Sequence, residues 1–105
     1  MDELQKILNE VRKRPNMYLG KVSLERLSAF IDGYMTCLRQ VNHDERLDFY
    51  PGFQKYVQET YHIQATKNWA SIITEFNVVE EDAFRRFFEL LDEFLKITEN
   101  QINYE

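Results

Sequence analysis

The chain has 105 residues, of which 44% are hydrophobic, 14% are aromatic and 30% are charged, and its net charge is −5. This length and composition fit one folded domain, residues 1–105, with a core of its own, and they exclude a disordered chain. No apolar run approaches the roughly 18 residues of a membrane-spanning helix, and the first residues lack the pattern of a secretory signal.

The excess of acidic residues is confined to the last quarter of the chain. Residues 1–79 carry ten acids and ten bases, whereas residues 80–105 carry eight acids and three bases. Such a segment repels nucleic-acid phosphates and attracts a basic protein, although charge runs are also typical of solvated helix faces. The single cysteine, Cys37, cannot form an internal disulfide, which favours a reducing, cytoplasmic location.

The first element is predicted to be a helix over residues 2–13. Its apolar residues recur at the spacing of one helix face: Leu4, Ile7, Leu8 and Val11. Asp2 is the predicted N-cap. Pro15 should end the helix because a proline disfavours helical geometry at the residue before it, Arg14.

Residues 16–22 are predicted to form a turn, followed by a second helix over residues 23–41 that Ser23 caps. Its apolar face is formed by Leu24, Leu27, Ile31, Tyr34, Met35 and Leu38. Gly33 lies inside this helix and costs about 1 kcal/mol relative to alanine, which a close approach of another helix would explain. Cys37 is expected to be a small buried hydrophobe.

Two shorter helices are predicted next, over residues 51–62, with proline at the first position, and over residues 67–76. A polar loop over residues 42–50 precedes them. The second of these helices is capped by Thr66 or Asn68. Its predicted apolar face consists of Trp69, Ile72, Ile73 and Phe76.

The last helix is predicted over residues 80–98, with a frayed tail over residues 99–105. Its apolar face is wide: Ala83, Phe84, Phe87, Phe88, Leu90, Leu91, Phe94 and Leu95. This width indicates either central packing or an edge left for a partner. Strand patterns are missing, so we predict an all-α fold, a compact antiparallel array of about five helices.

No pattern in the sequence predicts a catalytic, cofactor or metal site. A nucleophilic Cys/His pair would need Cys37 near His43 or His62, but Cys37 lies within an amphipathic helix, where a free cysteine is usually a small buried hydrophobe. The two histidines do not share a metal-binding spacing. The three glycines form no phosphate-binding loop. Neighbouring carboxylates on an exposed helix face stay ionised and solvated, unlike those of an acid–base site. We therefore expect a protein that is not an enzyme.

Residues 14–20 are the most distinctive stretch: Arg14, Pro15, Asn16, Met17, Tyr18, Leu19 and Gly20. They resemble the Arg-Pro-Gly-Met-Tyr-Ile-Gly segment of gyrase-type ATPase domains. The other nucleotide-binding motifs of that family are missing, and the chain is too short for its domain. We therefore interpret the stretch as a corner between helices, in which Met17 and Tyr18 are buried and Gly20 permits the reversal of the backbone.

A second resemblance extends over residues 11–95. It is carried by six short motifs in order: Arg14-Pro15-x-Met17-Tyr18-Leu19-Gly20, Ser23-Leu24, Phe30-Ile31-x-Gly33-Tyr34, Tyr56-Val57, Ile72-Ile73 and Phe87-Phe88-x-Leu90-Leu91. In these motifs the chain resembles small helical immunity proteins, which are encoded beside polymorphic or contact-dependent bacterial toxins. The resemblance implies a function without catalysis, in which the protein binds a cognate toxin domain, often a nuclease, and blocks its active site.

The acidic last quarter suggests which residues would bind a basic toxin. The expected contacts are Glu80, Glu81, Glu89, Asp92 and Glu93, with aromatic side chains beside them. Two alternatives remain open. One is a self-associating helical module that dimerises through the apolar face of residues 83–95. The other, weaker because the chain is acidic, is nucleic-acid binding through the basic residues Arg12, Lys13, Arg14 and Lys21.

Overall fold

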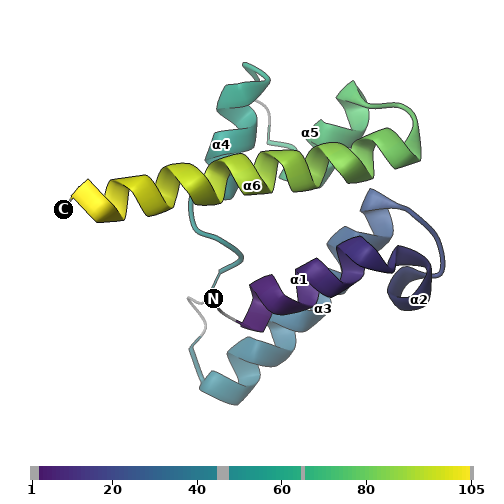
Figure 1. Ribbon diagram of the computed structural model, residues 1–105, viewed down its shortest axis with the longest axis horizontal. Coiled ribbons are helices and arrows are strands. Elements are labelled where there is room, and N and C mark those ends of the chain that lie inside the picture. The colour runs from purple at the N-terminus through teal and green to yellow at the C-terminus, as the bar shows by residue number, and fades with distance from the viewer. Residues whose placement is uncertain (1–2, 45–47, 65, 105) are drawn as a thin grey trace.

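The computed structural model describes residues 3–44, 48–64 and 66–104, with side chains up to residue 99. These residues form six helices: α1 (Glu3–Lys13), α2 (Pro15–Leu19), α3 (Leu24–Asn42), α4 (Phe53–Thr60), α5 (Trp69–Phe76) and α6 (Glu80–Tyr104) (Figure 1). No strand occurs among them, so the prediction of an all-α fold is confirmed. The predicted Asp2 cap and part of the predicted loop over residues 42–50 lie outside the described residues.

The additional helix is α2, where the sequence predicted a turn. Pro15 occupies its first turn, where the fixed φ of proline suits a helix and the missing N–H is not needed. Gly20 ends it with φ +84°, and its N–H donates to the Asn16 carbonyl at 2.9 Å. A helix of five residues presents only one inward face, and Leu19 occupies it. The prediction of a buried Met17 is therefore wrong: this side chain is 68% exposed.

Helix α3 begins as the sequence predicted, because the Ser23 hydroxyl accepts from the Arg26 N–H at 3.2 Å. It extends to Asn42, one residue beyond the predicted end. Two predictions for its interior are wrong. Cys37 is exposed, and a Cβ built on Gly33 has no neighbour within 4 Å, so no other helix approaches that glycine.

Gly33→Ala is consequently expected to stabilise the protein by about 0.5–1 kcal/mol. The substitution lowers the entropy of the unfolded chain and improves helix propensity without any clash in the folded state. Urea unfolding followed by circular dichroism measures the change. A destabilised Gly33→Ala variant would contradict the open environment of this position.

Helices α4 and α5 are shorter than predicted. Pro51 precedes α4 rather than beginning it, and Gly52, with φ +95°, occupies the N-cap. Of the two caps considered for α5, Asn68 is the correct one, since its side chain accepts from the Ser71 N–H at 2.9 Å. The Gln54 side chain links the two helices by accepting from the Trp69 N–H at 2.7 Å and donating to the Lys67 carbonyl at 2.9 Å.

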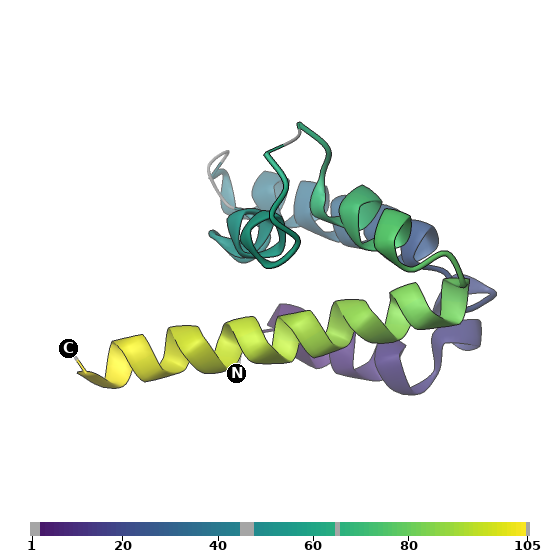
Figure 2. The same ribbon diagram turned by 90° about the horizontal axis from the view of Figure 1, so that it is seen from above.

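The six helices form two layers, with α1, α2 and α6 in one and α3, α4 and α5 in the other (Figure 2). The core lies between them. Its largest fully buried side chains are Phe53, Phe87, Leu8, Leu27, Ile31, Ile72, Ile73, Leu90, Val11 and Val57. Helix α6 contributes to this core along much of its length and is helical to Tyr104, so the predicted frayed tail is not observed.

The wide apolar face of α6 is used inside the chain. Ala83, Phe84, Phe87, Phe88, Leu90 and Leu91 are all buried, and Phe94 and Leu95 are partly buried against the core. Of the two interpretations of its width, central packing is the correct one. A dimer interface over residues 83–95 would require this core to open.

Candidate functional site

The five acids predicted to bind a partner fall into two groups along α6. Glu89, Asp92 and Glu93 lie in the middle of the helix, whereas Glu80 and Glu81 lie at its start. The rise of about 1.5 Å per residue separates the groups by about 12 Å along the helix axis. The structure therefore does not bring the five residues together into one site.

The central acids interact with other parts of the chain. Arg12 in α1 donates to Asp92 at 3.0 Å, and its guanidinium lies 5.0 Å from the centre of the Phe88 ring. Arg86 pairs with Glu89 at 3.4 Å and with Glu93 at 3.8 Å. These contacts fasten the neighbouring helix α1 to α6 and organise the charges along α6 itself.

Tyr56 in α4 adds a third link, because its hydroxyl donates to Glu93 at 2.9 Å. Partial burial is the main reason that the pKa of Tyr56 is raised above its usual value, and the Glu93 carboxylate raises it further. The folded protein therefore holds the phenol proton more tightly than the unfolded chain does.

Tyr56→Phe should accordingly lower the free energy of unfolding by about 0.5–1 kcal/mol at neutral pH, since one hydrogen bond is lost. The contribution of the raised pKa is complete below about pH 10, the ordinary tyrosine value, and is lost as the pH rises through the pKa of the folded state. Urea unfolding at neutral pH and above pH 10 measures this. A difference between wild type and variant that did not shrink at high pH would contradict the assignment.

The acids at the start of α6 adjoin exposed apolar side chains. Phe76, Val78 and Val79, in and after the last turn of α5, are 53%, 89% and 53% exposed. We call these three residues with Glu80 and Glu81 the α5–α6 corner. Glu80 forms an ion pair with Lys21 at 3.5 Å, and both side chains are more than half exposed. Glu81 is exposed and makes no ion pair within the described part of the chain.

The apolar part of this corner was not predicted from the sequence. The sequence predicted Phe76 on the buried face of its helix, and this prediction is wrong. The residue lies at the helix end and stacks on Tyr61, with ring centres 4.6 Å apart and ring planes at 16°. The available signal was the Val78-Val79 pair, because these two apolar residues lie in the three-residue connection between α5 and α6 and belong to the predicted apolar face of neither helix. Large exposed apolar groups gathered in one place are typical of interaction surfaces.

Helix α2 lies at the same end of the molecule as the α5–α6 connection in both views (Figures 1 and 2). It presents Met17 to solvent, whereas Tyr18 is half-buried and meets Phe30 edge to face at 6.5 Å. The Lys21–Glu80 ion pair joins the α2–α3 connection to the start of α6. The distinctive stretch of residues 14–20 therefore forms part of this end.

The basic residues considered for nucleic-acid binding are partly engaged elsewhere. Arg12 is bonded to Asp92, and Lys21 is paired with Glu80. Lys13 and Arg14 remain exposed at the end of α1. Because two of the four cations are paired with carboxylates, this surface is less basic than the sequence alone indicated.

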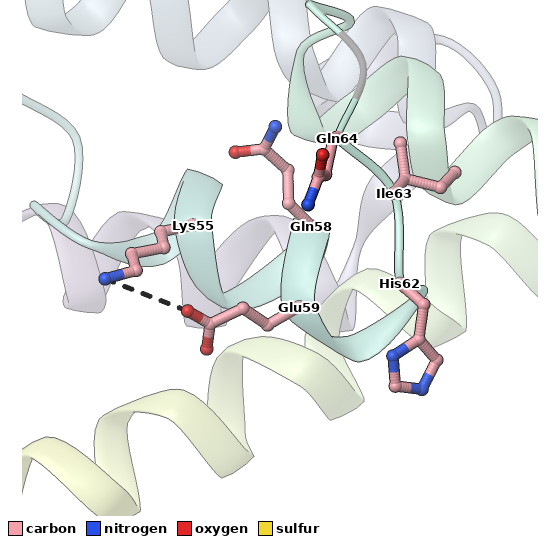
Figure 3. Close-up of a pocket in the computed structure, with 6 residues that line it drawn as sticks. All are labelled: Lys55, Gln58, Glu59, His62, Ile63 and Gln64. Carbon is pink, nitrogen blue, oxygen red and sulfur yellow. Dashed lines mark ion pairs between the residues drawn. The ribbon is translucent and has the colours of Figure 1, made fainter.

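A hollow of about 710 Å³ lies between α4 and the residues that follow it (Figure 3). It is lined by Lys55, Gln58, Glu59, His62, Ile63 and Gln64. Glu59 pairs with Lys55 at 3.8 Å, and the His62 ring points away from that carboxylate. Acyl or phosphoryl transfer requires a nucleophile in contact with a base. The polar side chains that line this hollow do not form such a pair.

Comparison with known protein families, with curated proteins and with solved structures finds no match for this chain. Among the described residues, no three side chains of histidine, cysteine, aspartate or glutamate are grouped closely enough to hold a metal ion. In the same part of the chain, no helix combines the length and the apolar character that a membrane crossing needs.

Proposed function

We propose that this chain is an immunity protein, which binds a cognate bacterial toxin in the cytoplasm and neutralises it without catalysis. The observation that carries the proposal is the α5–α6 corner, where exposed apolar side chains adjoin carboxylates. Exposed apolar side chains next to charged ones are typical of protein-binding surfaces. The similarity of residues 14–20 and of the helix faces to immunity proteins supports it.

The charge of the chain suits such a partner. Nuclease toxins carry basic clefts for their substrates, and a protein with net charge −5, whose excess acids all lie in residues 80–105, is attracted to a basic surface. Opposite charge accelerates association and selects the partner. The proposed inhibition is stoichiometric, with one immunity protein occupying one toxin domain.

Co-expression with the product of the neighbouring gene tests the proposal. If that gene encodes the toxin, cells that express it alone should stop growing, and cells that also express this chain should grow. The two proteins should then co-purify as a complex. Growth arrest without rescue, and no complex on co-purification, would overturn the proposed function.

A further inference from the structure

We propose that the α5–α6 corner is the surface that docks on the toxin, and that its occupant is a basic patch with an apolar centre on the toxin. This inference rests on the proposed function and goes further by assigning the surface and the chemistry of the partner. The acids in the middle of α6 are assigned a different task, which is to hold the helices of this chain together.

The apolar side chains of the corner are largely exposed to solvent. Val78 is 89% exposed and stands beside two further apolar side chains that are each about half exposed. Phe76 is held in place by its stacking on Tyr61, so a partner meets a fixed ring and loses little conformational freedom by ordering it. Aromatic side chains of this kind are frequent centres of binding energy in interfaces.

The backbone of the corner is fixed as well. The Asn77 side chain donates to the Ile73 carbonyl at 2.9 Å, which closes the end of α5. The Ala83 N–H donates to the Val79 carbonyl at 3.0 Å, which starts α6 directly after the apolar residues. Phe76 is therefore presented by the end of α5, and Val78 and Val79 by the short connection to α6, so that binding requires little rearrangement.

The charges around the corner select a basic partner. Glu81 offers an exposed carboxylate, and Glu80 is held only by Lys21, in an ion pair whose members are both more than half exposed. Exposed pairs of this kind contribute little to stability and exchange partners readily. A lysine or arginine of the toxin can replace Lys21 at Glu80, and a second can meet Glu81.

The central acids of α6 are engaged by side chains of two other helices, α1 and α4. Asp92 is bonded to Arg12 from another helix, and Glu93 accepts from Tyr56 and pairs with Arg86. Recruiting them for a partner would break contacts between α6 and its neighbours. At the corner only the Lys21–Glu80 pair is given up, Glu81 makes no ion pair among the described residues, and exposed apolar side chains adjoin the two carboxylates.

Binding of purified variants to the purified product of the neighbouring gene, measured by isothermal titration calorimetry, tests the proposal. The paired substitution Val78→Ser and Val79→Ser should weaken binding at least tenfold. Val41→Ser is the matched control, because Val41 is also exposed, at 68%, and lies at the end of α3. Glu81→Lys should also weaken binding and make it less sensitive to salt, whereas Glu99→Lys, an equal charge change farther along α6, should not.

The outcomes separate the inference from the function. A wild-type complex that is weakened by the corner variants and not by the two controls supports the inference. A wild-type complex that the corner variants leave unchanged overturns the inference and leaves the proposed function intact. No complex with wild type overturns both, and circular dichroism of each variant verifies that any lost binding is not lost folding.

Discussion

Phe87→Ala is expected to cost about 3–5 kcal/mol of folding free energy, the usual range for removing a buried aromatic ring. Phe87 has no exposed surface and lies at the centre of the aromatic cluster between the two helix layers. Its ring lies 4.9 Å from that of Trp69, 5.8 Å from that of Phe53 and 6.4 Å from that of Phe49. Since small domains are stable by only about 5–15 kcal/mol, this variant should be largely unfolded at modest urea concentrations.

The fluorescence of Trp69, which contacts the deleted ring, reports the unfolding transition directly. Phe76→Ala is the matched control, because it removes the same side chain from a half-exposed position. Its expected cost is about 1 kcal/mol or less. Similar losses for the two variants would contradict the assignment of Phe87 to the core and of Phe76 to the surface.

The second large effect is expected at Gly20, where alanine should cost about 1–3 kcal/mol. Gly20 has φ +84°, a region that side chains with a Cβ disfavour. A Cβ there would lie 2.6 Å from Nη1 of Arg26, which donates to the Leu19 carbonyl at 2.7 Å. The substitution therefore strains the backbone and displaces the side chain that stabilises the end of α2.

Gly33→Ala is the internal comparison, since it makes the same chemical change at an unstrained helical position. The two variants should shift the urea midpoint in opposite directions. If Gly20→Ala were neutral or stabilising, the positive φ at this position and the Arg26 contact would both be in question.

The periodicity of apolar residues predicted most of this fold correctly. The stripes in α1, α3 and α6 extend over several turns, so each defines its buried face by repetition. Ser23 acts as the N-cap that its position indicated, and Asn68 is one of the two caps, with Thr66, that were predicted for α5. Capping depends on neighbours three residues away, which the sequence displays.

The errors fall where the pattern is too short to define a face. Met17 lies in a helix of five residues, and Phe76 is the last residue of α5. In both cases the sequence predicted a core position for an apolar side chain, although too few turns surround the residue for repetition to define a buried face. Cys37 was assigned by its residue type, and residue type does not fix the side of a helix.

The candidate site was harder to predict because it depends on contacts between distant residues. Arg12 and Asp92 are separated by 80 positions in the sequence. The sequence displayed the negative charge of α6, but it did not reveal which acids are engaged by α1 and α4. The corner emerges only once α5 and α6 are placed, since its apolar residues belong to a helix end and a connection.

Titration of the purified toxin with this chain, with toxin activity measured at each molar ratio, tests whether inhibition is stoichiometric. A stoichiometric inhibitor predicts that activity falls in proportion to the chain added and reaches its minimum at one equivalent. Toxin activity that persists beyond one equivalent would contradict stoichiometric inhibition. Complete loss of toxin activity over time with a small fraction of an equivalent would also contradict it, because that result would indicate an enzyme.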